Sequence, residues 1–220
     1  MPPVSVLLAV LAVAASATMA CVAAYRRDRK GVYLFKPLTT ILIVAATLWL
    51  FAPAARRYQD IVVLGLILSL AGDAFLMLPA DRFVAGLAAF LAAHLAYVAA
   101  FTLGVGFEPA QLAWLAPFAF FGLMVAVYVW RGLGGAALKG AVAAYVAVIV
   151  VMAWRAAVRA QSPAVPFYSG VAALAGAILF LASDSVLAVD RFRRPFRLAQ
   201  PVVFATYWAA QLLIGLSVRA

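Results

Sequence analysis

The stretch DIVVLGLILSLAGDAFLMLP, residues 60–79, decides the fold class of this chain. Between its terminal residues it carries a single ionisable side chain, that of Asp73. At 1.5 Å per residue, a helix of about 20 residues matches the hydrocarbon thickness of a bilayer, roughly 30 Å. The stretch lacks the alternation of polar and apolar residues that is typical of a barrel strand. It therefore predicts a membrane-spanning helix with one carboxyl group inside it.

The rest of the chain has the same character as this stretch. Of its 220 residues, 69% are hydrophobic and only 11% are charged, whereas soluble domains carry about 25% charged residues. A soluble fold of this size could not bury so much apolar surface. We therefore expect an all-α, polytopic membrane protein of about eight helices, in one domain covering residues 1–220. The expected spans are 4–25, 33–53, 60–79, 83–105, 111–131, 138–157, 165–189 and 199–219.

The basic residues lie mainly in the short gaps between these spans. The net charge of +10 would suggest nucleic-acid binding in a soluble protein, but here control of membrane topology explains it better, and we expect no nucleic-acid partner. The odd-numbered loops contain eleven Lys and Arg residues and the opposite side contains five, among them Arg155 and Arg159. This bias predicts that the odd-numbered loops face the cytoplasm and that both termini lie outside.

The N-terminal apolar run, residues 4–25, is expected to be the first spanning helix. It is longer than the core of a signal peptide, and its basic cluster follows it instead of preceding it. Cys21 is the single cysteine, so the chain can form no internal disulfide. No sequence pattern specifies an oligomeric state.

Two segments of the chain resemble each other. Residues 68–83 read LSLAGDAFLMLPADRF, and residues 179–192 read LFLASDSVLAVDRF. Both contain a small residue, an Asp, an apolar stretch and then Asp-Arg-Phe, and they lie in spans that run in the same direction. The similarity favours two parallel four-helix halves with a site at their junction, with chance similarity between apolar helices as the alternative.

Asp73 and Asp184 are the strongest candidates for functional residues. They lie roughly 7–9 Å inside the predicted cytoplasmic ends of their spans. A carboxylate at that depth is costly unless it is paired, protonated or exposed to a watery cavity, so such residues are usually functional. The alternative is a buried polar contact that only joins two helices.

Five more polar residues are predicted to approach the same region: Lys36, His94, Tyr97, Tyr207 and Gln211. His94 and Tyr97 are three residues apart, and Tyr207 and Gln211 are four apart, so each pair shares one face of its helix. Each also has a structural interpretation. Lys36 could extend to the interface as an anchor, His94 could join two helices, and the tyrosines could serve packing alone.

Two carboxyls in one cavity of low dielectric tend to differ in protonation, with one neutral and one ionised. That arrangement suits general acid and base catalysis of hydrolysis through an oxocarbenium ion. A proton-coupled transporter or a lipid-binding protein could use the same pair, and an assembly or scaffold protein would need neither. Residue chemistry alone leaves these alternatives open.

The order of the polar motifs resembles that of the YhhN-like family of membrane proteins, which includes the mammalian lysoplasmalogenases. The resemblance extends from the second to the eighth span, and no single motif is specific by itself. The motifs are Lys36-Pro37-Leu38, Gly72-Asp73-Ala74-Phe75-Leu76-Met77, Ala93-His94-Leu95-Ala96-Tyr97, Ser183-Asp184-Ser185-Val186-Leu187-Ala188, and Tyr207 with Gln211.

The resemblance implies an eight-helix membrane hydrolase. The expected reaction cleaves the vinyl ether of a lysoplasmalogen to a fatty aldehyde and glycerophosphoethanolamine or glycerophosphocholine. One of Asp73 and Asp184 would protonate the vinyl ether while the other activates water. Lys36 would hold the phosphate, and the remaining polar residues, His94, Tyr97, Tyr207 and Gln211, would orient water or the glycerol hydroxyl.

The resemblance requires no cofactor, and one His with two Asp residues makes a poor zinc site. The expected partners are a lysophospholipid substrate and membrane lipids. The Ala-rich composition suggests a bacterium of high genomic GC content, which would place the protein in a bacterial plasma (inner) membrane. Because many such organisms are not expected to make plasmalogens, another vinyl ether or lysophospholipid is an alternative substrate.

Overall fold

The computed structural model describes residues 4–49, 55–80 and 82–219, and all regular structure in these residues is helical. Eight helices are long and apolar enough to cross a membrane, which confirms the predicted fold class. A short 3₁₀ helix, η2 (Pro109–Trp114), forms the first part of the fifth span, which covers Pro109–Trp130 and continues as α5. The eight are α1 (Val4–Arg26), α2 (Arg29–Trp49), α3 (Arg56–Met77), α4 (Phe83–Thr102), α5 (Leu115–Trp130), α6 (Gly135–Gln161), α7 (Phe167–Phe192) and α8 (Ala199–Leu216).

Several helices extend beyond the apolar runs that predicted them. α2 begins at Arg29 instead of residue 33, α6 covers residues 135–161, and α7 continues to Phe192. Backbone hydrogen bonding does not stop where the apolar run ends, and long basic side chains can reach polar surroundings from inside a helix. The predicted end of the second span, including Pro53, lies outside the described residues, as does Asp81 of the first repeated segment.

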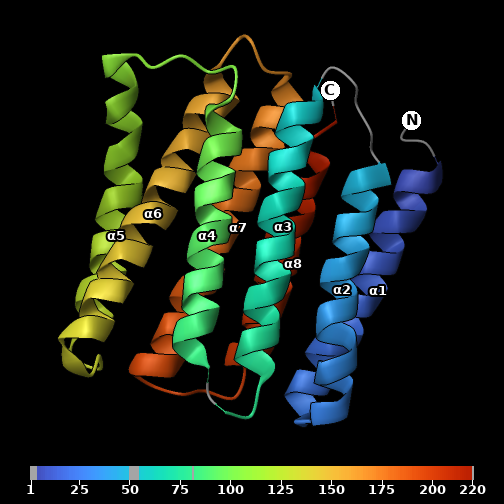
Figure 1. The fold of residues 1–220 in the computed structure, drawn as a ribbon, viewed down its shortest axis with the longest axis vertical. Coiled ribbons are helices and arrows are strands. Elements are labelled where there is room, and N and C mark those ends of the chain that lie inside the picture. The colour runs from blue at the N-terminus through green and yellow to red at the C-terminus, as the bar shows by residue number, and fades with distance from the viewer. Residues whose placement is uncertain (1–3, 50–54, 81, 220) are drawn as a thin grey trace.

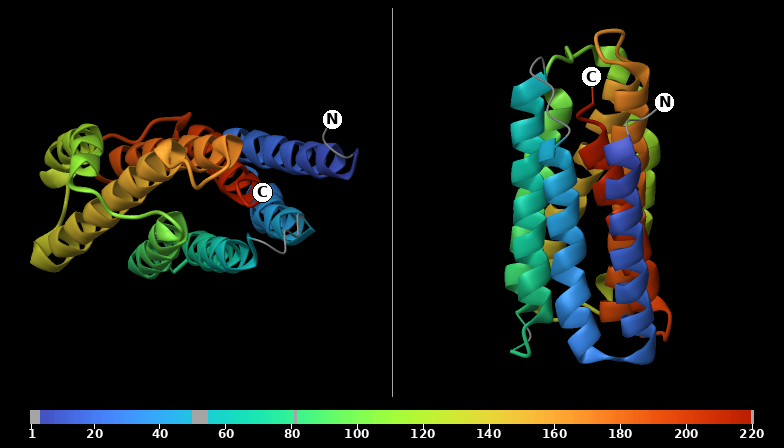
Figure 2. Two further views of the ribbon diagram at one scale, coloured as in Figure 1. Left: turned by 90° about the horizontal axis from the view of Figure 1, so that it is seen from above. Right: turned by 90° about the vertical axis from the view of Figure 1, so that its right-hand side faces the viewer.

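The helices form an elongated bundle in which the N-terminal pair α1–α2 lies at one margin and α5 lies at the other (Figures 1 and 2). α8 packs against α1, α2, α3 and α7, and so joins the two ends of the sequence. The α1–α2, α3–α4, α5–α6 and α7–α8 connections share one end of the bundle, the lower end in Figure 1. We call this the basic end.

The packing of the first four helices is repeated in the second four. α3 packs closely against α4, and α7 packs in the same way against α8. α2 contacts α8, just as α6 contacts α4. Both close pairs depend on a glycine: a Cβ on Gly72 would lie 2.6 Å from the Phe90 ring, and one on Gly176 would lie 2.7 Å from Ile214. Small residues permit such close approach of membrane helices, and the repeated pattern agrees with two parallel halves.

The counted arginines of α6 are not loop residues. Arg155 and Arg159 lie inside the helix and are only 5% and 7% exposed. Arg155 donates to Thr102 and to the carbonyl of Val105, and Arg159 donates to the carbonyl of Leu103. They therefore fix the segment that follows α4 and do not mark a basic loop. Three of the five basic residues counted at this end remain when these two buried residues are set aside.

Candidate functional site

A cavity of about 960 Å³ extends from the loops of the basic end into the bundle. Four of the predicted site residues line it: Lys36, Asp73, Asp184 and Tyr207. The two aspartates come from α3 and α7, the equivalent helices of the two halves. The fold thus brings both candidate carboxyls to one cavity, although 111 residues separate them in the sequence.

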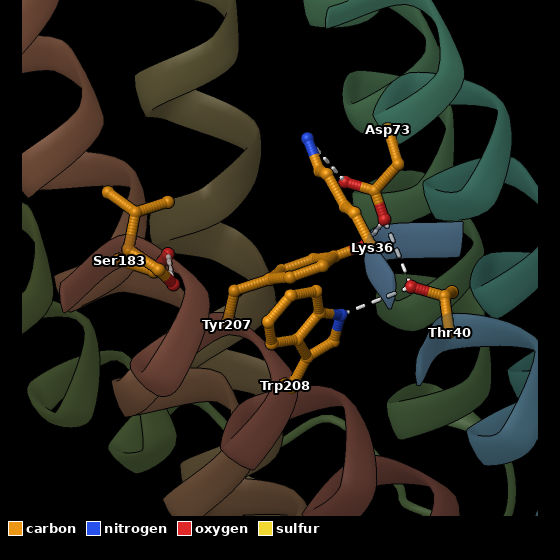
Figure 3. Close-up of polar contacts among 7 residues, drawn as sticks. Lys36, Thr40, Asp73, Ser183, Tyr207 and Trp208 are labelled. Carbon is orange, nitrogen blue, oxygen red and sulfur yellow. Dashed lines mark hydrogen bonds and ion pairs between the residues drawn. The ribbon is translucent and has the colours of Figure 1, made fainter. Parts of the chain in front are cut away.

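Asp73 lies in a dense network of donors and is 1% exposed. The Lys36 ammonium is 3.2 Å from its Oδ1. Its Oδ2 accepts hydrogen bonds from Thr40 Oγ1 at 3.0 Å and from the Tyr207 hydroxyl at 2.9 Å. Figure 3 shows these side chains converging from α2 and α8, with Trp208 Nε1 donating to Thr40 at 3.2 Å. An ammonium and two hydroxyl donors stabilise an ionised carboxylate.

Asp184 has a less polar environment. Its Oδ2 accepts a hydrogen bond from the Tyr145 hydroxyl of α6 at 2.5 Å. His94 Nε2 of α4 lies 3.8 Å from the same oxygen, which is too far for a hydrogen bond. The side chain is 16% exposed, more than that of Asp73. No Lys or Arg ion pair is found at Asp184 among the described residues, so here the neutral carboxylic acid is less disfavoured than at Asp73.

His94 lies behind Asp184 and does not line the cavity. Its imidazole is fully buried, and its ring packs edge-on against Tyr145 and Phe180, at centroid distances of 5.1 Å and 4.6 Å. Neither ring nitrogen has a hydrogen-bond partner within the described part of the chain. His94 therefore lies beside the Asp184 carboxyl and outside the lining of the cavity.

Tyr97 and Gln211 form a separate pair away from the cavity lining. The Tyr97 hydroxyl donates to Gln211 Oε1 at 2.7 Å, and both residues are fully buried. The bond joins α4 to α8, and hence one half to the other. Two of the four residues predicted to orient water or substrate therefore contact each other, and neither donates directly to an aspartate.

Tyr145 is a site residue that the sequence did not single out. It lies in an apolar helix without a polar neighbour to mark it. The internal repeat offered a signal, because Tyr145 precedes Asp184 by 39 residues and Lys36 precedes Asp73 by 37. Thr40 and Trp208 complete the Asp73 network. The sequence did not mark them, because Thr and Trp side chains are also common in ordinary helix packing.

The outer part of the cavity is lined by exposed arginines. They come from three connections of the basic end and the adjoining helix ends, and they outnumber the acidic residues beside them, Asp28 and Asp190. Guanidinium groups suit phosphate because they offer several donors in a planar fork. The lining arginines are Arg27, Arg29, Arg82, Arg191 and Arg197.

Metal-ligating side chains do not gather at this site. Over residues 4–49, 55–80 and 82–219, no group of three or more His, Cys, Asp or Glu residues is placed to hold a metal ion.

Comparison with known proteins identifies the family. The chain is 38% identical to the human protein named lysoplasmalogenase TMEM86B, over 80% of this chain and 71% of that protein. It is 34% identical to bovine lysoplasmalogenase TMEM86A, over 75% and 66%. It is 30% identical to the uncharacterized membrane protein YhhN of Escherichia coli O6:H1, over 93% and 95%. No solved structure is significantly similar. Since residues 31–218 match the YhhN family, this multi-pass membrane protein belongs to that family.

Proposed function

We propose that the protein hydrolyses the vinyl ether of a lysoplasmalogen-like lysophospholipid. The observation that carries the proposal is the single cavity lined by two aspartates with unlike partners. The names of the mammalian relatives support the substrate class. A single-chain lipid also suits a site that begins at the headgroup level and extends into the bundle.

The different partners of the two carboxyls suggest their roles. Asp73, paired with Lys36, would be the ionised general base. Asp184, which lacks such a cation, would carry the proton and act as the general acid. Two carboxyls in unlike environments commonly divide acid and base roles in this way. On this assignment the main role of Lys36 is to pair with Asp73, and binding of a phosphate would be secondary.

The reaction would consume one water and require no redox partner. Asp184 gives its proton to the second carbon of the alkenyl chain, which leaves an oxocarbenium ion at the first carbon. A water held by Tyr207 adds to that carbon while Asp73 accepts its proton. The hemiacetal then collapses: its hydroxyl gives up a proton, the bond from carbon to the glycerol oxygen breaks and that oxygen takes up a proton, so that the products are a fatty aldehyde and the glycerophospho headgroup with a free hydroxyl. Proton return to Asp184 completes the cycle.

The substrate's phosphate would lie among the arginines of the cavity mouth. Since basic loops favour the cytoplasm, we place the basic end on the cytoplasmic side of a bacterial plasma membrane. Tyr97 and Gln211 would act only indirectly, by fixing α4 against α8.

The test measures aldehyde release by purified protein in lipid nanodiscs supplied with lysoplasmalogen. Asp184→Asn and Asp73→Asn should each lower turnover by about 10²–10⁴-fold, the usual contribution of a general acid or base. Asp60→Asn is the matched control, because that carboxyl is 66% exposed at the opposite end of the bundle, and it should retain full turnover.

Two outcomes would contradict the proposal. Aldehyde release that survives both substitutions would exclude these carboxyls from the chemistry. Uptake of intact lipid into sealed vesicles without aldehyde would favour a transporter that uses the same pair.

A further inference from the structure

A second, much smaller cavity of about 60 Å³ adjoins the first. Its walls come from α3, α4, α5, α6 and α7 and are almost wholly apolar. We call it the apolar crevice. Its polar members already have partners: Tyr145 donates to Asp184, and the Ser185 hydroxyl donates to the carbonyl of Leu181. No Lys, Arg or Glu lines it.

Asp184 lies where the two cavities meet. Five residues line both, and Asp184 is the polar one among them; the others are Leu76, Phe83, Phe90 and Leu187. Asp73 lines only the large cavity. A molecule that extends from one cavity into the other must therefore pass Asp184.

The crevice arises because the two halves pack differently. In the repeated pattern, α1 corresponds to α5 and α8 corresponds to α4. α1 packs firmly against α8, but no comparable packing joins α5 to α4 among the described residues. The space opens between Phe83 and Leu87 of α4 and Val125 and Val129 of α5. The second half thus departs from the first at the place where the crevice lies.

We propose that the apolar crevice binds the first carbons of the substrate's single alkenyl chain while its glycerophospho headgroup lies in the large cavity. This inference rests on the proposed function. It places the junction between chain and headgroup, which is the vinyl ether, at Asp184. The carbon to be protonated then lies on the chain side, beside the residue assigned as the acid.

The rest of the chain would leave the crevice toward the bilayer. Leu87, Val125 and Val146 are half-buried, so the crevice is not sealed from the lipid-facing surface. Its volume of about 60 Å³ leaves room for a few chain carbons at most. The site would therefore select single-chain amphiphiles, because a second chain on the glycerol would have to occupy the large, arginine-lined cavity.

The test is a binding measurement with a saturated 1-O-alkyl lysophosphatidylethanolamine, which lacks the vinyl ether. Val125→Phe should weaken its binding in nanodiscs by about tenfold or more, the usual cost of losing part of an apolar subsite. Binding of glycerophosphoethanolamine, which has no chain, should not change. Val127→Phe is the matched control on the same helix, because Val127 is 65% exposed.

A second measurement does not depend on any variant. The wild-type protein is photo-crosslinked to the same lipid with a diazirine near the ether carbon, and the labelled peptides are mapped. Labels on α5 or α6, which line the crevice and not the large cavity, support the inference, whereas labels confined to the other helices overturn it. Equal weakening by Val125→Phe and Val127→Phe, or none by either, also overturns it. Crevice labelling without aldehyde release from lysoplasmalogen would refute the proposed function and leave chain binding intact.

Discussion

The half formed by α1–α4 and the half formed by α5–α8 hold their aspartates in similar helical frames but surround them differently. Asp73 receives groups from α2 and α8, and Asp184 receives them from α6 and α4, the equivalent helices of the other half. Around Asp73 these groups are an ammonium and two hydroxyls. Around Asp184 they are one hydroxyl and an imidazole beyond hydrogen-bond distance.

This difference teaches that a repeated frame can hold two chemically distinct carboxyls. The frame fixes where each carboxyl lies, and the residues on the neighbouring helices decide its protonation. The second half also packs more loosely at α5, which leaves an apolar space beside Asp184 that has no counterpart beside Asp73 in the described cavities. On the proposed assignment, the first half would provide the ionised base, and the second would provide contact with an apolar chain.

The largest expected difference between the two carboxyls is in the free energy of unfolding of their Asp→Asn variants. Asp73→Asn leaves the Lys36 ammonium, 8% exposed, without its counter-ion, and should lower the free energy of unfolding by about 3 kcal/mol. Asp184→Asn leaves no buried cation unpaired, and the new amide oxygen can still accept a hydrogen bond from Tyr145. The free energy of unfolding should therefore change by no more than about 1 kcal/mol. Denaturant unfolding in detergent micelles measures both.

A double substitution tests the cause of that difference. Lys36→Met combined with Asp73→Asn removes both charges and should recover most of the lost stability, because replacing a buried ion pair by apolar groups is often neutral. Equal destabilisation by the two single Asp→Asn changes would show that the halves do not differ in the way described.

A smaller effect is expected at Tyr145. Tyr145→Phe removes the hydroxyl that holds Asp184 at the end of the crevice. A hydrogen bond to a carboxyl is worth about 1.5 kcal/mol, so kcat should fall roughly tenfold, with little change in KM. Steady-state kinetics on lysoplasmalogen measure this. A normal kcat would remove Tyr145 from the positioning of Asp184.

The smallest effect on turnover is expected at Tyr97 and Gln211, the pair that joins the halves away from the cavity lining. Tyr97→Phe removes a hydrogen bond to buried Gln211 and should lower stability by about 1–2 kcal/mol, because the amide oxygen loses its donor. Turnover below the unfolding temperature should remain within about twofold, since a small stability loss leaves nearly all molecules folded. A large loss of kcat with normal stability would show instead that Tyr97 takes part in the reaction.

Much of the candidate site could be predicted from the sequence because a charged residue in an apolar helix is conspicuous. Asp73 and Asp184 stand out because a carboxylate inside a membrane-spanning helix is energetically costly, and both line the cavity. Lys36 and Tyr207 were expected to approach the same region, and in the structure both contact Asp73. Tyr97 and Gln211 were also placed by depth, but depth does not specify the direction in which a side chain points, and these two contact each other.

The sequence by itself determined the number of helices, their approximate limits and the charge asymmetry between the two ends, because apolar length and the cost of unpaired backbone groups in lipid leave few alternatives. Only the tertiary structure decided which polar groups meet. Tyr145 was hidden among apolar residues, and the crevice beside it arises from the packing of α5 relative to α4. Such spaces depend on the lateral positions of helices, which follow from close packing of many side chains at once.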